Sequence, residues 1–243
     1  AADYLRKRGS EVRVNQAASG ISAEDGQIQG AWVNGALLEA DYYLLAVPWD
    51  GLLELLPSPL TTDPFFARLS QLQASPIVNV HLWYDRPVVG IDFAAFLNTP
   101  MQWLFNKSRL WGQEEARGQY LDISLSGAYD FVDMPGQDLV HLFSREISAF
   151  FPAARTATPT SSLVVKQPNA TFAARPGAAR LRAGQRTPVP NLFLAGDWTD
   201  TGWPATMESA VRSGVLAAQA IIESEMKGGD SLSTTLASKR LQA

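Results

Sequence analysis

The sequence predicts a mixed α/β (α+β) fold, in which an antiparallel sheet domain is inserted into a second, discontinuous α/β domain. Three observations lead to this prediction: a short apolar strand closed by Pro48, a set of alternating strands in the middle of the chain, and a strand–turn–helix unit beginning at Asn191. Strands alternate apolar and polar residues, whereas helices repeat theirs every three or four residues. We place the discontinuous domain at residues 1–72 and 187–226, and the inserted domain at residues 73–186.

Length and composition exclude several classes of protein. The chain has 243 residues, of which 46% are hydrophobic, an ordinary proportion for a globular protein. A net charge of −4 provides no basic surface for nucleic acid. With no cysteine and two histidines, His81 and His141, we expect neither a disulfide nor a metal site. The apolar stretch at 205–222 is interrupted by Glu208 and Arg212, so no membrane-spanning helix is predicted.

The first third of the chain alternates short helices and strands. We expect a helix at 3–8, a strand at 11–21, a hairpin at 26–35, a buried strand at 42–47 and a helix at 49–56. The fourth of these is a continuous apolar run, which is typical of a strand buried on both faces.

The middle of the chain predicts strands at 77–85, 119–128 and 162–167, and a helix at 136–151. In the first strand, one face carries Val78, Val80, Leu82 and Tyr84, and the other carries Asn79, His81, Trp83 and Asp85. The helix has an apolar stripe of Leu139, Leu142, Phe143, Ile147 and Phe150. This pattern indicates an antiparallel sheet with a helix packed on one face.

The last part contains a buried strand at 191–195, a tight turn at Gly196 and Asp197, and a helix at 204–223. A glycine in such a turn lets the backbone approach a ligand closely, and a helix N-terminus attracts electron-rich groups. The helix has a face of small residues, namely Ala210, Gly214, Ala217 and Ala218. Residues 227–243 lack periodicity and are expected to form a flexible tail.

The run from Gly196 to Ser213 resembles the C-terminal flavin motif of the superfamily that contains flavin amine oxidases, carotenoid desaturases and squalene-associated desaturases. The resemblance implies a Rossmann-like domain with non-covalent FAD, in which Gly196 and Asp197 lie at the pyrophosphate and ribityl chain. It also implies that backbone N–H groups of Thr206, Met207 and Glu208 face the pyrimidine edge of the flavin. Such donors stabilise negative charge on the reduced ring.

Two other segments are similar to this superfamily. Ala46, Val47 and Pro48 resemble the end of the strand beside the flavin phosphates, and Ala18 matches a backbone contact to adenine. The Gly-x-Gly-x-x-Gly turn that opens such domains does not occur in the sequence. We therefore expect the chain to be the C-terminal portion of the enzyme, with further sequence upstream.

The resemblance also favours one branch of the superfamily. Asn79 stands where the amine oxidases have a lysine, and the positions of their aromatic cage correspond to Thr206 and a residue near Ala170, which disfavours amine oxidation. Residues 76–87 and 101–106 resemble the isoprenoid-acting branch, in particular the hydroxysqualene dehydroxylases, which reductively form squalene in hopanoid biosynthesis. Two alternatives remain: a carotenoid or phytoene-type desaturase or other member of the superfamily, and a non-catalytic chain that binds lipid or a partner and lacks the flavin half.

No catalytic residue is assigned from the sequence. Removal of a hydroxyl needs an acid, and Asp85, Asp122, Asp130 and His81 are candidates that have equally simple structural roles. The aromatic residues Trp83, Trp103, Phe105 and Trp111 are candidates for the wall of an apolar tunnel. We expect a cytoplasmic protein with an apolar isoprenoid substrate and peripheral contact with the inner membrane. The sequence predicts no oligomeric state.

Overall fold

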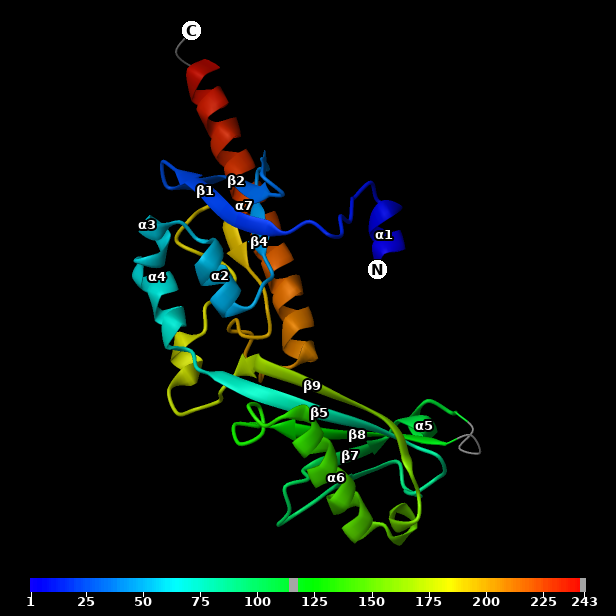
Figure 1. Ribbon diagram of the computed structural model, residues 1–243. Helices are drawn as coiled ribbons and strands as arrows, with labels where there is room; N and C mark the ends of the chain where they lie inside the picture. Colours follow the sequence, from blue (N-terminus) through cyan, green and yellow to red (C-terminus); the bar gives the residue numbers. More distant parts are fainter. Residues whose placement is uncertain (114–117, 241–243) are drawn as a thin grey trace. The chain divides into compact units, whose positions relative to one another are not determined.

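The computed structural model describes residues 1–113 and 118–240, with side chains described to residue 226 (Figure 1). Its contacts divide the chain into unit 1, Ala1–Leu72 with Ala174–Ala243, and unit 2, Gln73–Ala173. The sequence placed the second boundary at residue 186, later than the structure does. Residues 174–186 belong to unit 1 because Arg182 and Gln185 form hydrogen bonds to the loop that follows residue 195.

Unit 1 combines two small sheets with several helices. Its elements are α1 (Ala2–Arg6), β1 (Ala18–Glu24), β2 (Gln27–Val33), β3 (Ala36–Leu38), β4 (Tyr43–Leu45), α2 (Trp49–Leu55), α3 (Ser58–Thr61), α4 (Pro64–Ala67), the 3-10 helices η1 (Arg68–Gln71) and η4 (Ala178–Leu181), β10 (Leu192–Leu194) and α7 (Met207–Arg240). Strands β1, β2 and β3 form an antiparallel sheet, and β4 pairs with β10 in parallel.

The antiparallel sheet of unit 1 has two tight turns, where the sequence predicted one hairpin. Asp25 and Asn34 have positive φ angles, and each is followed by a glycine with positive φ. This Asp-Gly and Asn-Gly chemistry favours two-residue hairpin turns. The predicted strand at 11–21 begins only at Ala18, because β2 ends at Val33, the partner of Ala18, and offers nothing further to pair with.

The parallel pair β4–β10 lies beside the start of α7. All three residues of β10 are buried. In β4 the prediction of burial on both faces is wrong at Leu44, which is 41% exposed, although Tyr43 is only 7% exposed. The two strands run in the same direction, with Leu194 opposite Leu45, so their carboxyl ends meet at one edge.

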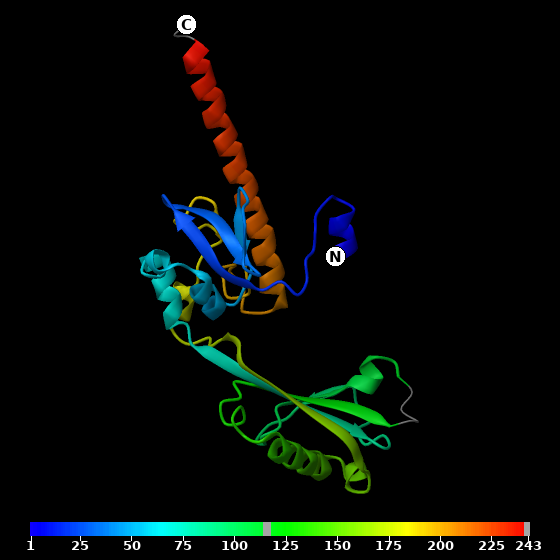
Figure 2. The ribbon, with the colours of Figure 1, turned by 45° about the horizontal axis from the view of Figure 1, so that its top comes forward.

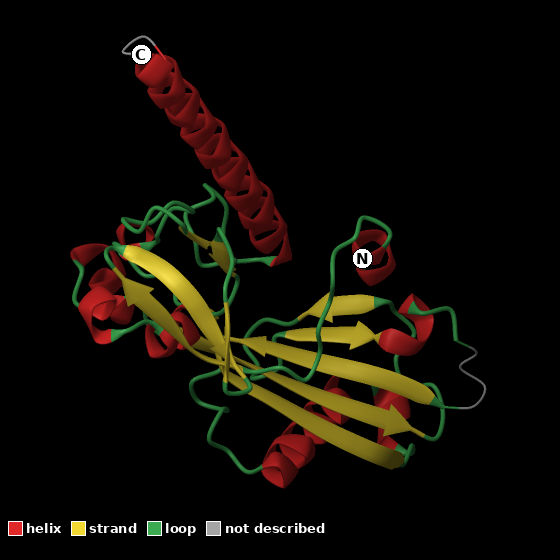
Figure 3. Cartoon of the chain, turned by 90° about the horizontal axis from the view of Figure 1, so that it is seen from above, coloured by secondary structure: helices red, strands yellow, loops and turns green. Residues whose placement is uncertain are grey.

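Unit 2 is an antiparallel sheet covered on one face by a helix (Figure 2). Its elements are β5 (Ala74–Tyr84), β6 (Phe93–Ala95), β7 (Trp103–Asn106), α5 (Lys107–Leu110), β8 (Gln119–Ser126), α6 (Gly136–Phe150), the 3-10 helix η3 (Pro152–Arg155) and β9 (Pro159–Phe172). The strand order is β6-β7-β8-β5-β9, and the long strands are visible in Figure 3.

The alternation in β5 sorts its residues between two different surfaces. The predicted apolar face is confirmed, because Val78, Val80 and Leu82 are fully buried and Tyr84 is 3% exposed. They pack in one core with α6, which contributes Leu139, Phe143 and Ile147. Each buried aliphatic side chain contributes roughly 1.5–3 kcal/mol to stability. Of the predicted helical stripe, Phe150 is the exception and is 46% exposed.

Helix α7 begins at Met207, later than predicted, and extends to Arg240, beyond the predicted end at 223. The preceding Thr206 caps it, since its Oγ1 accepts the N–H of Ser209 at 3.3 Å. The sequence predicted no regular structure at 227–243, whereas the helix continues to residue 240; residues 241–243 lie outside the described chain, and the flexibility of this segment stays a prediction. Extending a formed helix adds one hydrogen bond per residue, which offsets the weak propensity of its Gly, Ser and Thr residues.

The buried face of α7 is also displaced from the prediction. It consists of Ser209, Ser213, Ala217 and Ala220, while Ala210 and Ala218 are exposed. A shift of one residue corresponds to a rotation of about 100°. Across the residues that the structure describes, no helix combines the length and apolar character needed to cross a membrane.

Candidate functional site

The carboxyl ends of β4 and β10 bring two predicted site segments together. The N–H of Ala195 donates to the carbonyl of Leu45 at 3.0 Å, which continues the parallel ladder. Trp198 is only 1% exposed, and its indole Nε1 donates a hydrogen bond to the carbonyl of Val47 at 2.9 Å. As a result, Ala46, Val47 and Pro48 lie beside the turn at Gly196 and Asp197. The carboxyl edge of parallel strands is where ligands bind in such folds.

Gly196 occupies a backbone conformation that other residues rarely adopt, with φ of 144°. A Cβ atom at this position would lie 2.5 Å from Nε1 of the Trp198 indole. Its N–H donates to Ser213 Oγ at 2.8 Å, which ties the turn to α7. The Trp198 side chain therefore requires a glycine here on its own account, and the closeness of this turn to a ligand stays a prediction.

Arg182 holds the loop after this turn. Its guanidinium donates to the carbonyl oxygens of Trp198 at 3.2 Å, Trp203 at 2.8 Å and Asp197 at 3.0 Å, and also to the carbonyl of Thr199. Burial lowers the pKa of Arg182, but a guanidinium stays charged in proteins. Sequence reasoning missed this residue, because backbone carbonyls leave no side-chain pattern to detect.

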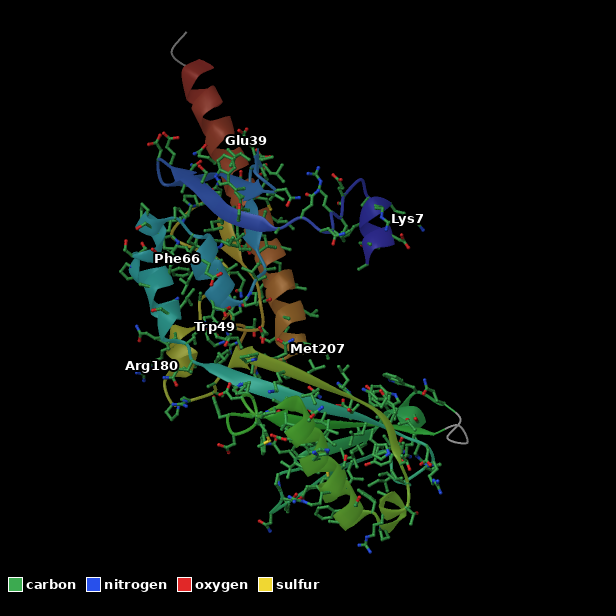
Figure 4. The ribbon with its side chains drawn as sticks, viewed as in Figure 1. Lys7, Glu39, Trp49, Phe66, Arg180 and Met207 are labelled. Atoms are coloured by element: carbon green, nitrogen blue, oxygen red, sulfur yellow. The ribbon has the colours of Figure 1, made fainter. Side chains whose placement is uncertain are left out.

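The first turn of α7 is fastened to the same loop. Ser209 Oγ donates to the carbonyl of Asp197 at 3.0 Å, so the helix starts next to the glycine turn. The N–H groups of Met207 and Glu208 lie in the first turn, where a helix provides no intrahelical acceptor. Met207 is 88% exposed, and Figure 4 labels it at the start of the helix. This end of α7 therefore has N–H donors and a positive dipole end that an electron-rich group could use.

Unit 2 has a polar cluster on the sheet face opposite α6. Asp122 in β8 is 8% exposed and accepts a hydrogen bond from Asn79 Nδ2 at 3.0 Å. Its Oδ1 lies 3.5 Å from Nδ1 of His81, and the same nitrogen lies 2.9 Å from the hydroxyl of Tyr120. Trp83 stacks on Tyr120, with ring centroids 4.5 Å apart. The structure thus brings together two candidate groups, Asp122 and His81.

The other candidate acids have different surroundings. Asp85 accepts from Arg86 at 2.7 Å and from the Thr158 N–H at 3.0 Å. These hydrogen bonds lower the pKa of Asp85 to about 2, so it is ionised at neutral pH and is not a proton donor. Asp130 is exposed in the turn that follows β8. Of the candidate tunnel aromatics, Trp103 stacks on Phe105 and both border a cavity of about 290 Å³ with Phe93 and Ser124.

Residues 1–222 match the protein family described as flavin-containing amine oxidoreductase. The chain belongs to this family. The family's description names a flavin as its cofactor, and FAD is accordingly the cofactor expected for this chain. The match includes both units of the structure, so it covers the glycine turn as well as the inserted sheet.

Two curated relatives and one solved structure illustrate what the chain is similar to. It is 32% identical over 235 residues to the 15-cis-phytoene desaturase of Synechococcus elongatus, covering 90% of this chain and 49% of that protein. It is 34% identical over 178 residues to the hydroxysqualene dehydroxylase of Sinorhizobium fredii, covering 73% of this chain and 38% of that protein. An oxidoreductase from Methanosarcina mazei shares the fold, with a TM-score of 0.66, 16% identity, and coverage of 90% of this chain and 51% of that one. The chain thus spans about half the length of these proteins or less.

The residues of unit 1 fit the flavin of this family. Small or short side chains at Ala46 and Pro48 are exposed beside Gly196, and the open end of α7 adjoins them. Thr206 differs from its prediction, because it is the capping residue before the helix rather than part of it. Ala18 begins β1 in the other sheet, and no hydrogen bond among the described residues connects it to this group. Its adenine contact stays a prediction.

Asp197 carries a pH-dependent stability term. Burial raises the pKa of Asp197, partly opposed by backbone N–H donors and by Arg182. Because the folded-state pKa is raised, the protonated carboxyl contributes to the stability of the folded protein at low pH. This contribution is lost as the pH rises through the folded pKa. We therefore expect Asp197→Asn to raise the melting temperature near pH 8, and the gain to shrink as the pH is lowered and the wild-type carboxyl becomes protonated. Thermal unfolding of the flavin-free protein across this range tests it. The exposed Asp200→Asn serves as control, and a gain that grows on acidification would contradict the assignment.

Proposed function

We propose that the protein is an FAD-dependent oxidoreductase acting on an isoprenoid, and that its reaction is the reductive dehydroxylation of hydroxysqualene to squalene. The observation that carries this proposal is the sheet face of unit 2, where a polar cluster around Asp122 lies among aromatic side chains. A hydrocarbon would contact only the aromatic side chains of this face, whereas an alcohol would contact both the aromatic side chains and the polar cluster. The similarity to a hydroxysqualene dehydroxylase supports the same choice.

The reaction replaces a hydroxyl on an allylic carbon by hydrogen and releases water. When bound in reduced form, FAD supplies the hydride equivalent. The chain's own residues have three tasks: the carboxyl edge of β4 and β10 with the start of α7 holds the cofactor, the aromatic face binds the apolar chain, and a polar group must deliver a proton to the departing oxygen. Asn79 stands where the resemblance expects the amine oxidase lysine, which disfavours amine oxidation.

A second candidate function is the desaturation of a carotenoid precursor. The phytoene desaturase of Synechococcus elongatus matches 90% of the chain, a larger share than the dehydroxylase relative does. The two reactions differ in direction, because desaturation oxidises the substrate and needs an electron acceptor, whereas dehydroxylation reduces it.

The direction of the reaction can be tested with the flavin-loaded protein under anaerobic conditions. In one arm the protein is chemically reduced and incubated with hydroxysqualene; in the other it is oxidised and incubated with 15-cis-phytoene and a quinone. We expect squalene in the first arm and unchanged phytoene in the second, measured by mass spectrometry of the extracted lipids. Desaturated phytoene without squalene would establish the second candidate instead. A polyamine under air should give no hydrogen peroxide.

A further inference from the structure

We infer that the open sheet face of unit 2 is a binding site for an isoprenoid alcohol, in which the imidazole Nε2–H of His81 donates a hydrogen bond to the substrate hydroxyl. The inference rests on the proposed function and names the residues that would hold its substrate. It follows from the register of the sheet, the hydrogen bonds of the polar cluster and the exposure of its neighbours.

The register places the polar pair at the centre of an apolar row. Phe93 is opposite Phe105, Phe105 is opposite Asp122, Asp122 is opposite His81, and His81 is opposite Leu163. Residues opposite one another share a face of the sheet, so these five side chains form one row from β6 to β9. Phe93 and Leu163, at the two ends, are 58% and 53% exposed. A long apolar chain with one hydroxyl in its interior fits this order of residues.

The aromatic neighbours widen the row into a surface for a hydrocarbon chain. On one side Trp103 stacks on Phe105 with ring centroids 6.0 Å apart, and Phe93 and Ser124 complete the border of the cavity of about 290 Å³. Further along the strands, Trp83 stacks on Tyr120. Such faces bind apolar chains without selecting a particular position along them. Selection of the hydroxyl therefore depends on the polar pair.

The hydrogen bonds of the cluster favour one tautomer of His81. Burial and the neighbouring Asp122 charge raise the pKa of Tyr120, which keeps its phenol protonated and able to donate. The phenol lies 2.9 Å from Nδ1, closer than Asp122 Oδ1 at 3.5 Å, and Asn79 already donates to that oxygen. We therefore assign Nδ1 as the acceptor of the phenol hydrogen; a neutral imidazole then has its hydrogen on Nε2.

The outer nitrogen of His81 is available to a ligand. Within the part of the chain that the structure describes, no group accepts a hydrogen bond from Nε2, and the His81 side chain is 15% exposed. A donor in this setting binds an alcohol oxygen but gains nothing from a hydrocarbon. Leaving such a group unpaired in an apolar environment is costly, so the site discriminates between the two.

The test is binding without turnover, with two ligands that differ in one hydroxyl. Flavin-loaded oxidised protein, without reductant, is titrated in detergent with hydroxysqualene and with squalene, and tryptophan fluorescence quenching gives both dissociation constants. We expect wild type to prefer the alcohol by roughly 3–10-fold, the contribution of one hydrogen bond. His81→Phe should lose the preference, because squalene no longer leaves a donor unpaired and hydroxysqualene no longer finds one. His81→Gln, whose amide can donate, should retain part of it.

Control variants separate this role from a general effect on the fold. Trp103→Ala should weaken both ligands by similar factors and leave the preference intact, because it removes only apolar contact. Equal wild-type affinities for the two ligands, or a preference that persists in His81→Phe, would overturn the inference. If hydroxysqualene is converted to squalene in either case, the proposed function stands without this site. A His81-dependent preference without squalene formation would support the site and refute the proposed reaction.

Discussion

Replacing Gly196 with valine is expected to abolish flavin binding and to lower the melting temperature by about 10 °C. The φ of 144° is unfavourable for a β-branched residue, and a Cβ would lie 2.5 Å from the Trp198 indole. Overpacking lowers the free energy of unfolding by roughly 1–3 kcal/mol, and the backbone strain lowers it by about as much again. Each kcal/mol lowers the melting temperature by about 2–4 °C in a chain of this size. Displacing the indole also breaks its hydrogen bond to the Val47 carbonyl. The measurements are the flavin-to-protein absorbance ratio and thermal unfolding.

The neighbouring Gly202 provides a matched control for this substitution. It also has a positive φ, of 69°, but no atom lies within 4 Å of the position of its Cβ. Gly202→Val therefore includes the backbone strain without the collision with Trp198, and we expect it to retain most of its flavin. A Gly196→Val protein with normal flavin content would show that the turn does not adopt the described conformation or does not adjoin the cofactor.

Arg182→Ala is expected to lower the free energy of unfolding by about 3–5 kcal/mol and to release the flavin. The substitution leaves several carbonyls between Asp197 and Trp203 without their charged donor, and hydrogen bonds to charged groups are worth roughly 1.5–3 kcal/mol each before the loop relaxes. Arg182→Lys should not restore binding, because a single ammonium cannot reproduce the fork of a guanidinium. Chemical denaturation and flavin content measure the two effects.

Arg186 is the matched control for this arginine. It forms an ion pair with Glu223 at 2.9 Å, and its side chain is 45% exposed. Exposed ion pairs contribute about 0–1 kcal/mol, so Arg186→Ala should retain flavin and nearly all of its stability. If Arg182→Ala behaved like Arg186→Ala, the loop after Gly196 would not depend on the guanidinium, and our account of how the site is held would fail.

The parts of the fold that the sequence predicted are those with strong periodicity. Alternation in β5 identified its buried face, and the apolar stripe of α6 identified the helix above it. The phase of α7 was not predictable in this way, because its small residues differ little in hydrophobicity. Ser209 and Ser213 are buried because their hydroxyls bond to the turn at Asp197 and Gly196, which the sequence pattern does not reveal.

The candidate sites show the same difference between features with a sequence pattern and features without one. The glycine turn and the start of α7 were found through a local motif, whereas Arg182 acts through backbone carbonyls that have no sequence pattern. The cluster of His81 and Asp122 depends on the register between β5 and β8, and a shift of one residue would place one of them on the opposite face. Sequence reasoning could name both residues as candidates, but it could not pair them.

Hydrogen–deuterium exchange with and without FAD tests most directly the claim that the edge of β4 and β10 with the start of α7 holds the flavin. The first-turn amides of Met207 and Glu208 have no intrahelical acceptor, so they should exchange fast in the flavin-free protein. We expect FAD to slow exchange in peptides covering residues 44–50 and 196–210, and to leave α6 in unit 2 unchanged. If these two peptides exchanged equally fast with and without FAD, and protection were confined to other parts of the chain, this assignment of the flavin site would be contradicted.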